Sequence, residues 1–255
     1  AVGSETSGSI LSPSSQNSVV GLKPTLGLLS RTGIIPISST LDTPGPMTKN
    51  VNDNAIMLDA MTGVDVNDSA SVISESAYSN LENTSLKGQR FGSFKGLMED
   101  SLYVEALSKL KNEGAEIIEI EEQQIDLPGF IRLLNLDMKN DLPVYLQKYA
   151  NEAISFKSVG DLIEFNKKDS LKRLPYGQAL FLGIVADKGN EEDLQKIKDT
   201  LSTNGKLFFD VPMKIYNLDG ILSINNFHAG YAAVAKYPAI TVPMGYQTDG
   251  KPKGL

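Results

Sequence analysis

The 255-residue chain contains no cysteine and one histidine, His228. Without cysteine there can be no disulfide, no thiolate nucleophile and no Cys-ligated zinc. A single histidine also excludes a metal site built from several histidines. Carboxylates would have to hold any metal, and the chain has no D-x-D-x-D-G run of the kind that binds calcium. We therefore expect neither a metal nor a cofactor.

Long apolar runs are missing too. The chain has no stretch of eighteen apolar residues and no leader in which charged residues precede apolar ones, which predicts no membrane span, no signal peptide and a cytoplasmic location. Acidic residues outnumber basic ones, 31 to 24, and the net charge of -7 disfavours nonspecific binding to nucleic acid. With 41% apolar residues the chain can bury one substantial core or two small ones.

The stretch that indicates chemistry lies at the amino end. Small residues dominate positions 3–9, so the backbone can turn tightly and bring several N–H groups together. Such a loop can hold an anion, with Thr6, Ser7 and Gly8 donating N–H groups and Ser9 attacking whatever is held. The alternative is a solvated turn, which is the more common role of a Ser/Gly-rich stretch.

Four sequence blocks occur in order at close spacing. They are E-T-S-G-S-I-L-S-P from Glu5, V-G-L-K-P-T from Val20, Gly33, and D-T-P-G-P-M from Asp42. Together they resemble the amidase signature family, whose members carry D/E-T-x-G-S-I-x-x-P, V-G-L-K-P-T, a Gly-containing strand and D-x-x-G-P-M. The variant with Glu5 and Ser7 resembles most the peptide amidase branch and related bacterial amidases.

The resemblance implies an α/β fold with a mixed central sheet covered by helices on both faces. It also implies that residues 1–255 are a single amidase signature domain truncated at both ends, because the first residue is not methionine and the tail stops before the family's C-terminal helix. The family's catalytic lysine and second serine come from upstream segments that these residues do not include. We therefore expect an incomplete copy of the fold.

The resemblance further implies an amidase that hydrolyses a small-molecule carboxylic amide, at a C–N bond other than a peptide bond. Ser9 would form the acyl-enzyme, Thr6, Ser7 and Gly8 would bind the oxyanion, and the upstream lysine and serine would relay the proton. The 255-residue chain alone is then expected to be inactive and, with sheet edges exposed, to self-associate. Two other functions stay open: a noncatalytic binding or assembly protein, for which Leu11 in place of the common arginine leaves room, and an amidotransferase A subunit.

Three further residues have competing interpretations. Lys23 could be a buried general base, but its place in the G-L-K-P-T block favours a structural role. Asp42 is expected to cap the turn that follows it rather than transfer a proton. His228, with Asp42 or Asp219, is a second-choice base for Ser9 in a Ser-His-Asp arrangement, although an isolated loop histidine more often serves only as a hydrogen-bonding residue.

Periodicity predicts an alternation of helices and strands. Asp42 to Pro46 is too rich in proline for a central strand and is expected to be a rigid loop. Within 127–149 the pattern allows two helices or one kinked at Pro143, and Asp137, where the family often has glutamate, could face substrate or the core. The other elements that the pattern predicts are strands near 19–22, 115–120 and 218–224, a strand and turn over 28–33, an extended piece over 34–37, helices near 52–61, 101–113 and 191–201, and a long loop over 64–85, solvated or facing substrate. The resemblance to the amidase signature family implies a strand at 89–94 and a helix at 158–166.

Overall fold

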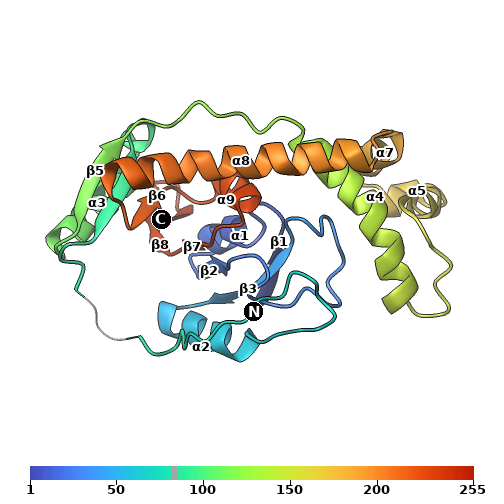
Figure 1. The fold of residues 1–255 in the computed structure, drawn as a ribbon, viewed down its shortest axis with the longest axis horizontal. Coiled ribbons are helices and arrows are strands. Elements are labelled where there is room, and N and C mark those ends of the chain that lie inside the picture. The colour runs from blue at the N-terminus through green and yellow to red at the C-terminus, as the bar shows by residue number, and fades with distance from the viewer. Residues whose placement is uncertain (82–84) are drawn as a thin grey trace. The chain divides into compact units, whose positions relative to one another are not determined.

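The computed structural model describes residues 1–81 and 85–255 (Figure 1). They divide into two compact units. Unit 1 comprises Ala1–Thr32, Thr43–Asp126 and Ser202–Leu255, and unit 2 comprises Gly33–Asp42 and Leu127–Leu201. Helices and strands alternate along the chain, which confirms the predicted α/β class.

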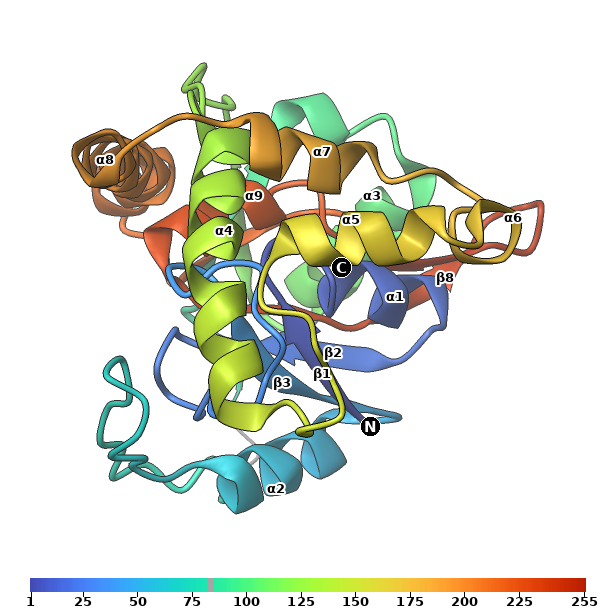
Figure 2. The same ribbon diagram turned by 90° about the vertical axis from the view of Figure 1, so that its right-hand side faces the viewer.

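A four-stranded antiparallel sheet in unit 1 has the order β1-β3-β2-β7. Helix α2 covers one face of this sheet and α1 the other (Figures 1 and 2). The predicted strand at 19–22 and helix at 52–61 are confirmed, and Asn50 caps the helix by accepting from the Asp53 N–H at 2.8 Å. The bounds are β1 Val2–Glu5, α1 Leu11–Gln16, β2 Val20–Lys23, β3 Thr43–Thr48, α2 Val51–Met61 and β7 Ala239–Thr241.

The prediction of a rigid loop at Asp42 to Pro46 is wrong, because residues 43–46 belong to β3, a central strand of this sheet. The Met47 N–H donates to the Ala1 carbonyl at 2.9 Å. Successive N–H positions along a strand face opposite sides. At residues 44 and 46 the position that an N–H would occupy therefore faces away from β1. On that side β2 pairs only with Met47 and Thr48. Both prolines therefore sit where no ladder bond is lost.

A second sheet in unit 1 is parallel, with the order β5-β4-β6. The predicted strands near 89–94 and 115–120 and the helix between them are confirmed, whereas β6 is shorter than the predicted 218–224. Its core contains Phe94, Ile120 and Phe208. The bounds are β4 Arg90–Phe94, η1 Lys95–Leu97, α3 Ser101–Asn112, β5 Glu116–Ile120, β6 Gly220–Leu222, α9 Ala229–Ala235, and a hairpin of β8 Pro243–Tyr246 and β9 Pro252–Gly254.

Residues 28–33 do not form the predicted strand and make only an isolated bridge. Their polar side chains bond to carboxylates elsewhere in the chain instead. Ser30 donates to Asp65 at 2.6 Å, and Arg31 pairs with Asp68 at 2.5 Å. The bond from Arg31 lowers the pKa of Asp68 to about 2. These bonds fasten the segment to the predicted 64–85 loop, which has no helix or strand in its described residues; residues 82–84 lie outside them.

Helix α8 (Glu191–Tyr216) extends well beyond the predicted 191–201. Leu194, Leu201 and Phe208, spaced seven residues apart, are each at most 2% exposed, so one apolar stripe continues past the predicted end. The prediction stopped early because Thr-Asn-Gly at 203–205 is a poor helix former. Gly205 is used for close packing: a Cβ there would lie 2.8 Å from the Ala235 nitrogen.

Unit 2 is helical around a cluster of Leu142, Val159, Ile163 and Ile184. The predicted helix at 158–166 is confirmed. Within 127–149, residues 130–149 form one helix with Pro143 inside it, so the two-helix alternative is wrong. Residues 34–37 pair with no strand among the described residues. The bounds are α4 Phe130–Tyr149, α5 Val159–Lys167, α6 Ser170–Arg173 and α7 Ala179–Ala186.

Candidate functional site

The predicted Ser9 loop is a tight turn over residues 6–10, between the end of β1 and the start of α1. The buried Glu5 carboxylate closes it. Its Oε2 accepts hydrogen bonds from the Ile10 N–H at 2.7 Å and the Leu11 N–H at 3.0 Å. Leu11 is the first residue of α1 and Ile10 precedes it, so Glu5 satisfies two N–H groups that have no partner within the helix.

Ser9 is exposed, whereas its neighbours Gly8 and Ile10 are buried. Gly8 has a φ of +91°, a left-handed conformation that favours glycine. In the described part of the chain, the N–H groups of Ser7, Gly8 and Ser9 donate no hydrogen bond. The turn thus presents a solvent-accessible hydroxyl together with consecutive main-chain donors.

The same turn packs against the residues that precede α9. A Cβ added at Gly8 would lie 2.9 Å from Asn226 Nδ2 and 3.5 Å from the Ala229 Cβ. Asn226 and Ala229 line a pocket of about 670 Å³, and so does Leu11, two residues beyond Ser9. The Ser9 turn therefore borders the pocket.

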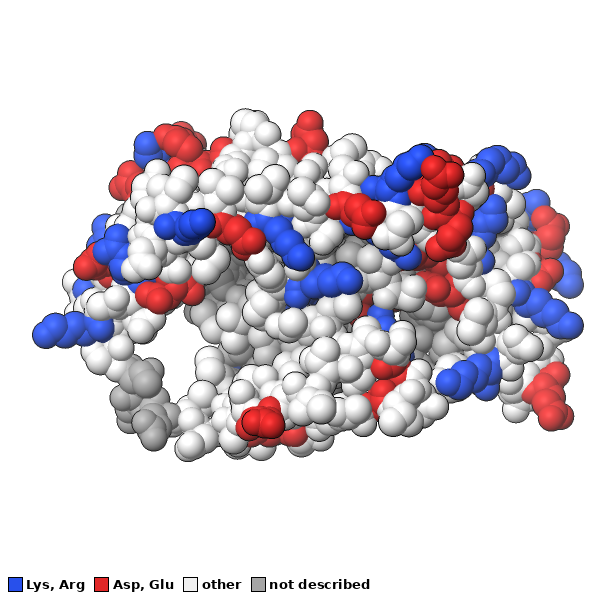
Figure 3. All heavy atoms as spheres, in the orientation of Figure 1, with Lys and Arg blue, Asp and Glu red and all other residues white. Residues whose placement is uncertain are grey.

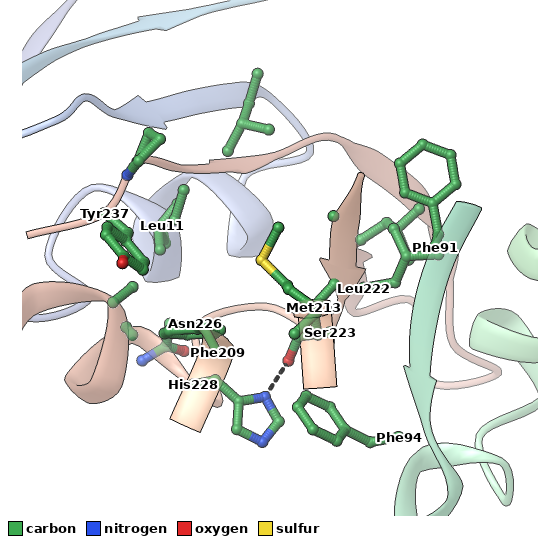
Figure 4. Close-up of a pocket in the computed structure, with 18 of the residues that line it drawn as sticks. Leu11, Phe91, Phe94, Phe209, Met213, Leu222, Ser223, Asn226, His228 and Tyr237 are labelled. Atoms are coloured by element: carbon green, nitrogen blue, oxygen red, sulfur yellow. Dashed lines mark hydrogen bonds between the residues drawn. The ribbon is translucent and has the colours of Figure 1, made fainter. Parts of the chain in front are cut away.

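The pocket is mainly apolar and lies within unit 1 (Figure 4). Phe91 and Leu222 line it from the parallel sheet, and Tyr237 and Ile240 from the segment around β7. Strands β6 and β7 both contribute to its wall, and each is the last strand of its sheet among the described residues. An apolar cavity with a few polar groups is the usual form of a small-molecule site.

His228 does not serve Ser9. Its Nδ1 lies 2.6 Å from Ser223 Oγ, and its Nε2 lies 3.5 Å from the Glu122 carboxylate (Figure 4 shows the bond to Ser223). Burial lowers the pKa of His228, against the opposing charge of Glu122. The Asp219 carboxylate accepts from the Arg90 N–H at 2.8 Å. The Ser-His-Asp arrangement is not formed.

Ser223 and Glu122 were absent from the sequence-based candidates. Ser223 precedes His228 by only five residues, a spacing that could have suggested the bond. Glu122 follows β5, far away in sequence, and the charged exit from that strand carries no signal of a histidine partner. The structure thus assigns His228 to a local hydrogen-bond group on the pocket wall.

Lys23 is 2% exposed, and its ammonium donates to the Pro24 carbonyl at 3.1 Å. Burial lowers its pKa to about 8, while the negative charge of Glu5 acts in the opposite direction. Lys23 therefore bonds to the backbone beside the Ser9 turn. This geometry agrees with the structural role predicted for it.

Asp42 and Asp137 both bond to residues of the 33–42 segment. Asp42 does not cap the following turn as predicted. Its carboxylate accepts from the preceding N–H groups of Ile37 and Ser38, both at 2.8 Å. Asp137, 1% exposed, accepts from the Ser38 hydroxyl at 2.5 Å and pairs with the Lys198 ammonium at 3.2 Å. Both carboxylates fasten the 33–42 segment.

No three His, Cys, Asp or Glu side chains within 1–81 and 85–255 gather closely enough to hold a metal ion. No helix in the same ranges is long and apolar enough to cross a membrane.

The sequence and the fold were compared with those of known proteins. A family model described as Amidase matches residues 1–203. A probable amidase of Arabidopsis thaliana is 36% identical across the whole chain, which covers 52% of that protein. An amidase family protein from Bacillus anthracis shares the fold with a TM-score of 0.92, at 33% identity over all of this chain and 52% of that one.

The native peptide amidase from Stenotrophomonas maltophilia has a TM-score of 0.88 and 31% identity, over all of this chain and 57% of that one. The chain thus spans about half the length of the relatives it matches. These similarities confirm the resemblance seen in the four sequence blocks. The chain belongs to the amidase family.

Proposed function

We propose that the native polypeptide carrying these 255 residues hydrolyses a small-molecule carboxylic amide through an acyl-enzyme on Ser9. The observation that carries the proposal is the Ser9 turn, where an exposed hydroxyl stands beside the N–H groups of Ser7, Gly8 and Ser9, which donate to nothing in the described part of the chain. Membership of the amidase family and the adjoining apolar pocket support it.

In the proposed reaction Ser9 Oγ attacks the amide carbonyl and loses its proton as the new C–O bond forms. The N–H groups of Thr6, Ser7 and Gly8 stabilise the negative charge on the carbonyl oxygen. Each such donor typically lowers the barrier by about 3 kcal/mol. The C–N bond then breaks as the amine gains a proton, and water hydrolyses the ester to release the acid and restore Ser9.

A proton acceptor for Ser9 is still needed. Lys23 is a poor candidate because its ammonium is buried, bonded to the Pro24 carbonyl and held beside the charge of Glu5. By the family resemblance, a lysine and a second serine outside residues 1–255 supply the relay. The 255-residue chain by itself is accordingly proposed to be inactive.

The test measures hydrolysis of simple primary and aryl amides by the native polypeptide and by the 255-residue chain, with fluorophosphonate labelling mapped by mass spectrometry. We expect turnover by the native polypeptide alone and a label on Ser9. Turnover without label on Ser9 would overturn the assignment. Amide binding without turnover would favour the noncatalytic binding protein. Acyl transfer in place of hydrolysis would favour the amidotransferase A subunit.

Gly8→Ala is expected to lower kcat about 100-fold while the protein remains folded. The new Cβ lies 2.9 Å from Asn226 Nδ2 at a φ of +91°, so the turn must shift and its donors lose their alignment. Steady-state kinetics and circular dichroism measure the two effects. Gly250→Ala is the control, because it has a similar φ of +82° and no atom within 4 Å of the new Cβ. Wild-type kcat in Gly8→Ala would refute the role of these donors.

We also propose that the 255-residue chain self-associates through the unpaired edges of β6 and β7. Sheet edges expose unpaired N–H and C=O groups, and Ile240 on β7 is 47% exposed. Sedimentation should show a mass above that of the monomer, reduced by Ile240→Lys but not by Val66→Lys, which changes a residue 92% exposed in the 64–81 loop. A monomer at every concentration would contradict the proposal.

A small amide is the proposed partner, with no nucleic acid or membrane. On the face shown in Figure 3, Lys and Arg lie interspersed with Asp and Glu. The net charge of -7 also disfavours binding to nucleic acid, because polyanions bind to continuous basic surfaces. A cytoplasmic location stays a prediction.

A further inference from the structure

Two buried charged side chains lie next to the Ser9 turn. Glu5 is the last residue of β1 and Lys23 the last residue of β2, and both strands run antiparallel to the β3 strand between them. Glu5 is 1% exposed and Lys23 2%. The β3 strand thus brings together, at one end of the sheet, two charges that are far apart in sequence.

Each of the two buried charges is stabilised by the opposite charge of the other. A charge buried without an opposite partner is strongly destabilising. Glu5 Oε2 accepts two N–H bonds, but Oε1 has no hydrogen-bond partner among the described residues. The Lys23 ammonium donates to the Pro24 carbonyl and not to this carboxylate, whose charge raises the Lys23 pKa against the larger effect of burial. The ammonium therefore supplies the positive charge that the buried carboxylate requires.

No other charge on the elements packed against β2 performs this task. Those elements are β3, β7, α1 and α2. The first three contain no titratable side chain. Helix α2 carries Asp53 and Asp59, and neither contributes to the pKa of Lys23. Among the described residues, Glu5 is the charged group that acts on Lys23.

We propose that the Lys23 ammonium is a positioning residue for Ser9. Its positive charge offsets the buried charge of the Glu5 carboxylate and holds that carboxylate in place. That carboxylate in turn holds the N–H groups of Ile10 and Leu11, and so fixes the turn that presents the Ser9 hydroxyl. The inference rests on the proposed role of Ser9 and adds the group that controls its position.

If Lys23 positions Ser9 in this way, the reactivity of Ser9 and the stability of the protein should respond to alkaline pH in opposite directions. Lys23 loses its proton near pH 8, which leaves the Glu5 carboxylate uncompensated, so the reactivity of Ser9 should fall. The stability contribution of Lys23 moves the other way: its pKa is lowered from 10.5 to about 8 on folding, so the unfolded chain binds more protons between these values and stability rises with pH there. If Ser9 lost reactivity because the whole protein unfolded, stability would instead fall as the pH rises.

The test uses the native polypeptide with Lys23→Met, Glu5→Gln and the double variant. Lys23→Met should lower the rate of fluorophosphonate labelling at Ser9 by about 10- to 100-fold, because the turn shifts. Adding Glu5→Gln should restore most of that rate, since a neutral amide oxygen accepts both N–H bonds without burying a charge. If Lys23 acted only by packing, the second substitution would add to the damage.

Two more measurements complete the test. Hydrogen exchange of the Ile10 and Leu11 amides should accelerate in Lys23→Met and recover in the double variant. The wild-type labelling rate should decline around pH 8, and this decline should be absent from the double variant. Wild-type labelling and exchange in Lys23→Met, or a double variant no better than Lys23→Met, would overturn the inference.

The proposed function and this inference fail separately. If the wild type is not labelled at Ser9, the proposed function is lost. Amide exchange at Ile10 and Leu11 still reports whether Lys23 and Glu5 hold the turn, because it does not depend on catalysis.

Discussion

Replacing Ser9 with alanine in the native polypeptide should abolish fluorophosphonate labelling and lower amide turnover by about 10⁴-fold or more. The effect is large because the acyl-enzyme needs an oxygen nucleophile, and the main-chain donors alone give only the residual rate. The N–H groups of Ser7 and Gly8 are backbone atoms and survive the substitution. Substrate should therefore still bind, so we expect kcat to fall much more than KM changes.

Ser4→Ala is the matched control. Ser4 is exposed and lies on β1, before the turn, so its loss should leave both labelling and turnover at wild-type levels. Undiminished turnover in Ser9→Ala would remove Ser9 from the mechanism. It would leave the apolar pocket as the next place to search for the reacting group.

Gly45→Ala should unfold unit 1 or cost about 3 kcal/mol or more in the free energy of unfolding. Gly45 lies in the central strand β3, where a Cβ would sit 2.0 Å from the Leu22 carbonyl oxygen and 2.9 Å from Ile10 Cδ1. A backbone oxygen cannot move aside as a flexible side chain can. Either β2 separates from β3 or the Ser9 turn, which Ile10 anchors, is displaced.

Urea denaturation followed by circular dichroism measures the loss. The control is Gly96→Ala, where the new Cβ meets no atom within 4 Å and the backbone is not left-handed. That substitution should change stability by less than about 0.5 kcal/mol. Equal midpoints for Gly45→Ala and Gly96→Ala would show that β2 can withdraw from β3 at little cost.

Local signals predicted several elements well. Asn50 accepts a hydrogen bond from the Asp53 N–H at 2.8 Å, at the start of the helix predicted after it. The strand near 115–120 was predicted because apolar and β-branched residues cluster there. In these places the residues that specify the element are neighbours in sequence, so propensity and capping are sufficient.

Elements that depend on distant partners were missed. The prolines of β3 argue against a strand until the direction of each N–H relative to β1 and β2 is known. The continuation of α8 past Leu201 depends on the close approach of Ala235 to Gly205. The segment 28–33 resembles a strand, yet its polar side chains find carboxylates in the 64–81 loop. In each case tertiary contacts override the local preference.

The sequence by itself determined the family, the Ser9 turn as the candidate centre and most of the capped helices, because these reside in contiguous residues whose chemistry is local. Only the tertiary structure decided that His228 bonds to Ser223 rather than serving Ser9, and that Lys23 and Glu5 are buried at the same end of one sheet. Those pairings come from strands and loops that meet across the fold, and no spacing along the chain encodes the distance between them.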